Sequence, residues 1–156
     1  MLGIGLLLGG QSLYAQTKAK RKEAKEKAVK EEIDSGRFRI QVNRALPARG
    51  GAVNLTTLYS LELRGDSILS YLPYYGRAYS LPYGGGEGMN FEALVSDYEL
   101  SYNKKKTARI EFKTRTKEDQ YTFQLRIFPG GSATIDVTPV NKQGIQYQGD
   151  LIPVQP

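Results

Sequence analysis

Residues 121–137, YTFQLRIFPGGSATIDV, decide the fold class of this chain. Apolar and polar side chains alternate over residues 121–127 and again over 133–137, and a Pro-Gly-Gly sequence at 129–131 separates the two runs. Alternation with a period of two is typical of a strand that buries one face, and the proline–glycine cluster is typical of a turn. The segment therefore predicts two antiparallel strands joined by a short connection.

The same alternation continues on both sides of this segment, with short polar or glycine-containing connections between the runs. Short connections favour antiparallel neighbours, and the spacing for strand–helix–strand units is missing. We therefore predict a mainly all-β chain with about eight strands in a single antiparallel sheet, curled into a barrel or folded as a sandwich. The alternating runs are 38–42, 59–64, 68–72, 98–102, 108–113, 121–127, 133–138 and 145–151.

A charged segment at residues 16–35 precedes the predicted β domain, which spans residues 36–152. Alanine, lysine, glutamate and arginine dominate this leader, and residues 17–34 contain neither glycine nor proline, so a helix is expected there. Gly36 is placed to end it. Apolar residues are few, so only the last turns are expected to dock, on one edge or one opening of the sheet. A basic helix lying on an anionic membrane is the other interpretation, but large apolar side chains are missing.

Residues 1–15 are apolar and uncharged up to Gly10 and end in Ala15, ahead of a polar stretch. This pattern is typical of a secretory signal peptide and predicts cleavage after Ala15. The apolar run is shorter than the ~20 residues of a transmembrane helix, so no transmembrane anchor is expected. The predicted location is the periplasm or the extracellular medium.

The composition excludes several kinds of chemistry. The 156 residues include no cysteine and no histidine. Disulfides, thiolate chemistry, the usual zinc ligands and histidine-dependent nucleophiles are therefore excluded, and we expect no metal and no cofactor. The net charge of +6 is weak support for a nucleic-acid partner, and none is expected.

One segment, residues 71–91, departs from the alternation and is rich in tyrosine, glycine and proline. A long irregular loop in a small domain is often functional, and tyrosine offers an apolar ring with a polar tip. The segment either packs over one end of the sheet or forms a surface for a ligand or partner. The candidate contact residues are Tyr71, Tyr74, Tyr75, Arg77, Tyr79 and Tyr83, and the loop-forming residues are Pro73, Gly76, Gly84, Gly85, Gly86 and Gly88.

Several short sequences in residues 35–151 are distinctive when taken together. They are Tyr71-Leu-Pro-Tyr-Tyr-Gly-Arg-Ala-Tyr79, Tyr83-Gly-Gly-Gly-Glu-Gly88 with Phe91, Ala45-Leu46-Pro47, Asn54-Leu55-Thr56, Gly65-Asp66-Ser67 and residues 147–151. With these sequences the chain resembles the domain-of-unknown-function family 4251, exported proteins of Bacteroidetes-type bacteria. The resemblance implies export and a compact β-rich domain, and it implies no activity and no catalytic residues.

These observations favour an exported, non-enzymatic binding module that uses the tyrosine- and glycine-rich loop, with a glycan, a peptide or an envelope component as partner. The alternative is a structural or envelope-associated interaction protein, in which the loop is core and the strand edges or the leader helix make the contacts. A weaker alternative is a hydrolase that uses two facing carboxylates. Its candidate acids are Glu87, Glu92, Asp97 and Glu99.

Overall fold

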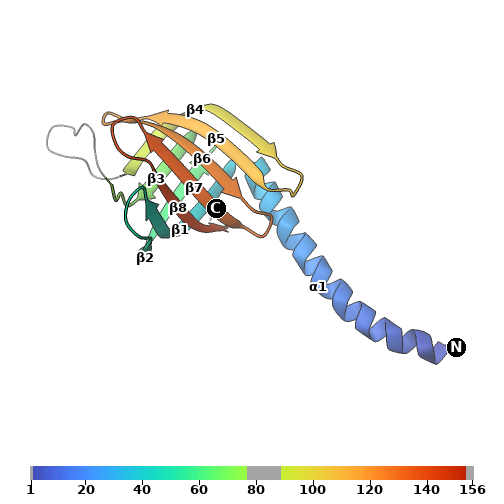
Figure 1. Ribbon diagram of the computed structural model, residues 1–156. Coiled ribbons are helices and arrows are strands. Elements are labelled where there is room, and N and C mark those ends of the chain that lie inside the picture. Colours follow the sequence, from blue (N-terminus) through green and yellow to red (C-terminus); the bar gives the residue numbers. More distant parts are fainter. Residues whose placement is uncertain (1, 77–88, 154–156) are drawn as a thin grey trace.

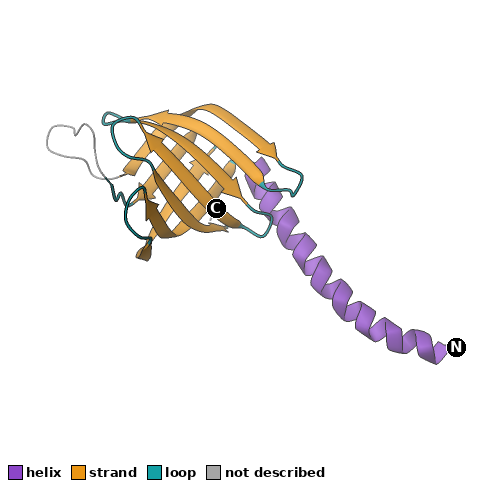
Figure 2. Ribbon diagram, viewed as in Figure 1, coloured by secondary structure: helices purple, strands orange, loops and turns teal. Residues whose placement is uncertain are grey.

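The computed structural model describes residues 2–76 and 89–153, in which one helix is followed by a closed antiparallel barrel (Figures 1 and 2). The predicted mainly-β antiparallel fold is confirmed, and of the two architectures left open the barrel is correct. The elements are α1 (Leu2–Asp34), β1 (Arg37–Pro47), β2 (Val53–Arg64), β3 (Ser67–Leu72), β4 (Met89–Tyr102), β5 (Ala108–Arg115), β6 (Gln120–Ile127), β7 (Ser132–Pro139) and β8 (Ile145–Ile152).

Each strand pairs with its neighbour in the sequence, and β1 pairs with β8 to close the barrel. The alternation in the sequence becomes an alternation in burial. On β6, for example, Tyr121, Phe123, Leu125 and Ile127 are at most 1% exposed, and the residues between them are exposed or half-buried. Every strand has two neighbours in the closed barrel, but β3 is short, so residues 53–59 of β2 and 95–102 of β4 have no register partner on β3.

Aromatic rings fill the barrel interior between β4, β5 and β6. The rings of Phe112 and Phe123 stack with their centroids 5.0 Å apart, and those of Phe91 and Tyr121 stack at 4.9 Å. Rings of this size bury large apolar areas and gain further from stacked geometry. This cluster is therefore a main source of the stability of the β4–β6 side of the barrel.

The end of α1 covers one opening of the barrel, one of the two positions that the sequence left open. Val29 and Ile33 are 9% and 2% exposed and belong to the hydrophobic core. The Tyr102 hydroxyl donates to an Asp34 carboxylate oxygen at 2.6 Å, and Gly36, with φ 74°, follows the last turn. The N-terminal part of α1 extends away from the barrel (Figure 1). Over the described residues, no helix has the length and apolar character needed to cross a membrane.

Three element boundaries differ from the prediction. The helix begins at Leu2, before the predicted start at residue 17. Strand β2 begins at Val53 and β4 at Met89, so residues 53–58 and 89–97 are strand where none was predicted. In β2 the pairing with β1 shifts register between Val42 and Arg44, which breaks the period of two over residues 53–58. In β4 burial alternates over residues 89–95, but the exposed Leu94 interrupts the apolar–polar pattern of the sequence, and the register with β5 shifts between Ser96 and Glu99.

One carboxylate on the outer face is buried between two cations. Glu62 is 2% exposed and forms ion pairs with Arg39, at 2.8 Å, and with Arg64. Burial alone would raise the pKa of Glu62, but the hydrogen bonds from Arg64 and Arg39 outweigh it and hold the pKa below its ordinary value of 4.5. A carboxylate with a depressed pKa stabilises the fold above its unfolded-state pKa.

We therefore expect the free energy of unfolding to fall as the pH drops below about 4.5, through the folded-state pKa of Glu62. Glu62→Gln should lower the free energy of unfolding at pH 7 by about 1–2 kcal/mol, because a charged hydrogen-bond acceptor is lost. The variant should also lose part of the pH dependence, since glutamine does not titrate. Urea unfolding at pH 3, 4, 5 and 7 measures both effects, and parallel pH profiles for the two proteins would contradict the assignment.

Candidate functional site

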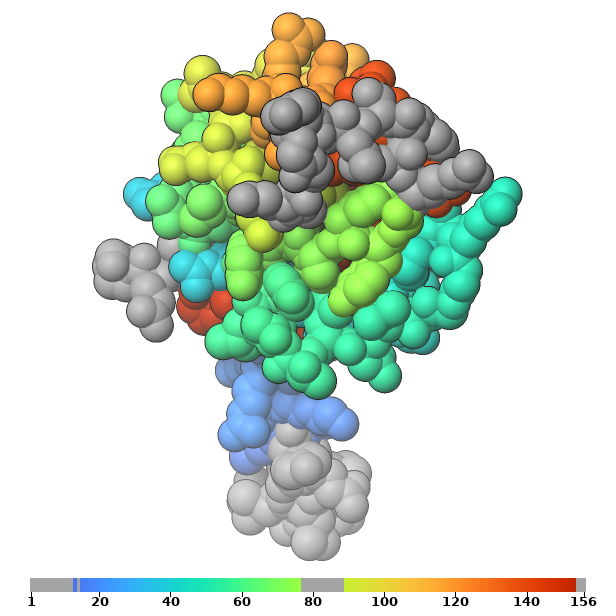
Figure 3. Space-filling model, turned by 90° about the vertical axis from the view of Figure 1, so that its left-hand side faces the viewer, coloured from blue at the N-terminus to red at the C-terminus, as the bar shows by residue number. Residues whose placement is uncertain are grey.

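The predicted tyrosine- and glycine-rich segment begins at the end of the barrel opposite α1. Here β3 ends at Leu72, residues 73–76 follow, and the chain re-enters the sheet at Met89. Figure 3 looks onto this end, where residues of β3 and β4 lie between the β1–β2 connection and the β5–β6 turn. The first and last residues of the segment are thus strand and not loop, which corrects the predicted loop bounds of 71 and 91.

Three hydrogen bonds fix the base of this segment to the barrel. The buried Tyr147 hydroxyl donates to the Pro73 carbonyl oxygen at 2.5 Å, and the Tyr74 hydroxyl donates to the Gln143 carbonyl oxygen at 2.8 Å. On the other side, the Ser70 hydroxyl donates to the Met89 carbonyl oxygen at 2.7 Å. Buried polar groups that are satisfied in this way hold the backbone in one geometry. Both ends of the connection therefore start from a rigid base, which we call the platform. It is formed by Ser70, Pro73, Tyr74, Met89 and Tyr147.

A buried lysine supports the same platform. Lys142 is 8% exposed, and its ammonium nitrogen lies 5.0 Å from the ring centroid of Tyr74 and 5.5 Å from that of Tyr121. It also donates to the Tyr121 hydroxyl at 3.4 Å. Burial, reinforced by the nearby Asp119, raises the pKa of Tyr121 to about 12. The Lys142 ammonium group lies between the hydroxyl of Tyr121 and the ring of Tyr74.

A buried acid joins the two neighbouring connections at this end. Asp119 is 5% exposed, and its carboxylate accepts the backbone N–H groups of Gln120 at 2.8 Å, Val140 at 3.0 Å and Asn141 at 3.1 Å. These bonds tie the β5–β6 turn to the β7–β8 connection. Neither Asp119 nor Lys142 was predicted from the sequence, because each lies in a polar turn of the kind that is usually solvated surface.

The predicted contact residues divide into anchored and exposed side chains. Tyr74 is half-buried, whereas Tyr71 and Tyr75 are 45% and 38% exposed. The ring of Tyr71 lies 5.2 Å from that of Tyr59 on β2. Of the predicted loop-forming residues, Pro73 is half-buried and Gly76 is exposed. The predicted residues Arg77, Tyr79, Tyr83, Gly84, Gly85, Gly86 and Gly88 lie outside the described residues.

Comparison with known proteins identifies the family. The profile of the family described as Domain of unknown function (DUF4251) matches residues 20–151. The chain belongs to this family. A crystal structure of a DUF4251 family protein from Bacteroides eggerthii is similar, with a TM-score of 0.66, 19% identity, and coverage of 83% of this chain and 88% of that one. No curated protein matches the chain. The predicted family resemblance is thereby confirmed.

The DUF4251 match includes the docked end of α1 together with the barrel from β1 almost to the end of β8. Val29 and Ile33, which close one opening, lie inside the matched region. The platform at the opposite end lies inside it as well. The helix end, the barrel and the tyrosine-rich end are therefore all parts of the family's domain.

Three of the acids proposed for a hydrolase, Glu92, Asp97 and Glu99, are exposed residues of β4 in this DUF4251 domain. Glu92 and Glu99 lie on β4 on either side of its bulge, where Asp97 has φ 53°. Glu99 pairs in register with Glu111 on the outer face of the barrel, and Glu87 lies outside the described residues. No set of three acidic side chains in residues 2–76 and 89–153 is placed to hold a metal ion.

Proposed function

We propose that this DUF4251 chain is a non-enzymatic binding domain whose contact surface is the tyrosine-rich end of the barrel. The observation that carries the proposal is the contrast between neighbouring tyrosines: Tyr74 is anchored to the barrel, while Tyr75 and Tyr71 are exposed. Exposed tyrosines on a rigid platform lose little conformational freedom when they contact a partner. This arrangement suits recognition of a saccharide ring or a peptide.

The chemistry of the buried groups supports binding in preference to catalysis. Asp119 is fully engaged with backbone N–H groups, and Glu62 is held between two arginines. The sequence supplies neither histidine nor cysteine for a nucleophile system. A binding role needs no group with a pKa near neutrality. The pKa of the Glu62 carboxyl is lowered from its ordinary value and not raised toward neutrality.

A pair of variants tests the proposal. The double variant Tyr71→Ala/Tyr75→Ala should change the free energy of unfolding by less than about 1 kcal/mol, because both side chains are exposed. It should weaken binding by about tenfold or more for any glycan or peptidoglycan fragment that raises the melting temperature of the unaltered chain. Thermal-shift measurement against a panel of both compound classes provides the readout.

Tyr74→Ala is the matched control for that experiment. It removes the hydrogen bond to Gln143 and one ring beside Lys142, so we expect it to lower the free energy of unfolding by about 2 kcal/mol or more. If the double variant is destabilised as strongly as Tyr74→Ala, the exposed tyrosines are scaffold and the proposal fails. Unchanged ligand binding by the double variant would also contradict the proposal.

A second candidate function is an interaction made through α1. The helix extends away from the barrel, and an apolar groove of about 330 Å³ runs beside its docked end, lined in part by Val29, Ile33 and Phe128. Contacts through unpaired strand edges are limited to residues 53–59 of β2 and 95–102 of β4, because the barrel is otherwise closed. Loss of an envelope contact on shortening α1, with the tyrosine variants unaffected, would favour this alternative.

Export remains part of the proposal and rests on the sequence of residues 1–15. The apolar run followed by Ala15 supports removal of a signal peptide and a periplasmic or secreted location. The mature chain is then expected to begin at Gln16. Mass spectrometry of the protein recovered from its native host checks this, and an intact Met1 would refute it.

A further inference from the structure

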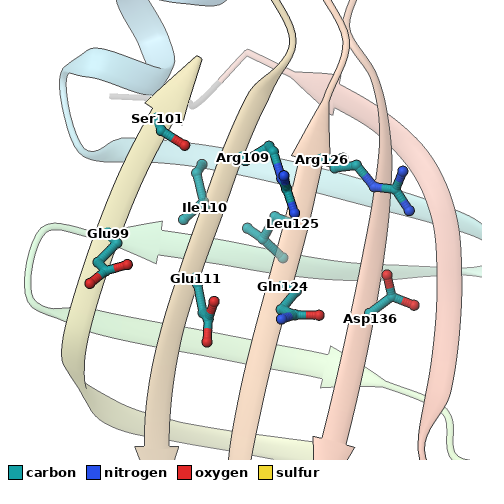
Figure 4. A pocket seen from close by; sticks show the side chains of 9 residues that line it. All are labelled: Glu99, Ser101, Arg109, Ile110, Glu111, Gln124, Leu125, Arg126 and Asp136. Atoms are coloured by element: carbon teal, nitrogen blue, oxygen red, sulfur yellow. The ribbon is translucent and has the colours of Figure 1, made fainter. Parts of the chain in front are cut away.

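The outer face of β4–β7 carries two rows of like charge that cross the strands. In one row Arg109 on β5 is the register partner of Arg126 on β6, and in the next row Glu99 on β4 is the partner of Glu111 on β5. Figure 4 shows these side chains standing on the same face, with the arginines above the acids. Like charges directly opposite each other destabilise a sheet, so both pairs carry a cost.

The two rows form no close ion pair with each other in the described residues. In the part of the chain that the structure describes, the ion pairs within 4.0 Å involve Lys27, Lys30, Arg39 and Arg64, and neither Arg109 nor Arg126 takes part in one. Asp136 on β7 continues the acidic row through Gln124, its register partner on β6. Two rows of opposite sign therefore lie side by side on one face, with no ion pair within 4.0 Å between their described side chains.

The face is hollowed where the rows meet. A depression of about 410 Å³ is lined by both arginines and the acids of the second row, together with Ser101 and Gln124. A second hollow of about 330 Å³ adjoins it, shares Glu99 and Glu111, and includes the half-exposed ring of Tyr98. Volumes of this size are in the range of small-molecule sites. The hollow therefore favours a small ligand over a flat protein surface.

The spacing of the rows defines the ligand. They are two residues apart along each strand, which is about 7 Å between backbone positions. An extended dipeptide spans about 7 Å between its amino and carboxyl ends. We propose that this face binds a short peptide by its two free termini, with Arg109 and Arg126 holding the carboxylate and Glu99 and Glu111 holding the ammonium group. Paired guanidinium groups match a carboxylate well, because each offers two parallel N–H donors.

A second copy of this chain is the competing occupant, since a two-fold axis would set each basic row against an acidic one. The residues lining the hollow are mostly polar or charged, however, whereas the centre of a stable dimer interface is apolar and depleted in charge. The small zwitterionic ligand is therefore favoured. This site lies on the side of the barrel and does not depend on the tyrosine-rich end.

Titration of the ¹⁵N-labelled full chain with alanyl-alanine tests the proposal, using acetyl-alanyl-alanine and alanyl-alanine amide as capped probes. The uncapped peptide should shift the amides of residues 99–101, 109–111 and 124–126. Each cap removes one charge and should weaken binding by at least about tenfold. Binding of the uncapped peptide should also weaken in 1 M NaCl, because the contacts are exposed charges.

Substitutions in one row at a time test the roles of the basic row and the acidic row separately. Arg109→Gln/Arg126→Gln should weaken binding by about tenfold or more and remove the preference for a free carboxylate, and Glu99→Gln/Glu111→Gln should remove the preference for a free amine. Arg115→Gln, on the same strand but outside the hollow, is the control and should bind normally. Equal binding of capped and uncapped peptides, absence of shifts on this face, or an Arg109-dependent dimer in place of peptide binding would each overturn the proposal.

Discussion

Gly149→Ala is expected to lower the free energy of unfolding by about 3 kcal/mol or more, at or above the upper end of the roughly 1–3 kcal/mol that overpacking usually costs. Gly149 lies on β8, opposite Val42 of β1, where those two strands close the barrel. A Cβ atom at Gly149 would collide with the carbonyl oxygen of Gln41, and it would lie 2.8 Å from that carbonyl carbon and 2.9 Å from Val42 Cα. These are backbone atoms, so no side-chain rotation relieves the clash.

The variant can accept the added atom only by separating β1 from β8, which opens the barrel. Urea unfolding followed by circular dichroism measures the effect. Gly130→Ala in the β6–β7 turn is the matched control, because a Cβ atom there meets nothing within 4 Å, and we expect a change below about 1 kcal/mol. Equal unfolding midpoints for the two variants would show that close approach at the seam does not require glycine.

Phe123→Ala is expected to cost about 3–5 kcal/mol of unfolding free energy, the typical loss for a buried aromatic ring. Its ring is fully buried and lies 5.0 Å from that of Phe112, 6.2 Å from that of Tyr121 and 6.5 Å from that of Phe91. Removing it leaves a cavity that touches three strands of the barrel. Neighbouring strands paired in a closed sheet have little freedom to collapse into such a space.

Two further substitutions make this prediction specific. Phe123→Leu should recover about half of the loss, since it restores most of the volume without the ring stacking. Phe128→Ala removes the same side chain where it is 40% exposed and should cost less than about 1 kcal/mol. Calorimetric unfolding measures all three variants, and similar losses for Phe123→Ala and Phe128→Ala would contradict the assigned core.

Local alternation was sufficient to predict eight antiparallel strands, but it predicted neither the first halves of β2 and β4 nor how the sheet closes. The burial of Phe123 follows from its place between polar neighbours, and the end of the helix follows from Gly36. Closure depends on contact between β1 and β8, which are distant in the sequence. Glycine inside a strand is a known sign of close backbone approach, so Gly149 carried a signal that the sequence analysis did not use.

The candidate site was only partly predictable for a different reason. Tyr74 and Tyr75 are adjacent and chemically identical, yet one hydroxyl bonds to Gln143 and the other side chain is exposed. That difference depends on where β8 and the β7–β8 connection lie in space. Lys142 and Asp119 were missed because their burial depends on partners brought together by the barrel.

A map of amide shifts tests whether the tyrosine-rich end of the barrel is the contact surface. The ¹⁵N-labelled chain is titrated with each glycan and peptidoglycan fragment of the panel. We expect at least one fragment to shift the amides of Tyr71, Tyr75 and Gly76, and Tyr71→Ala/Tyr75→Ala to abolish those shifts while the fold stays intact. Shifts confined to α1 and the β4–β5 turn, or no shifts from any fragment, would contradict it.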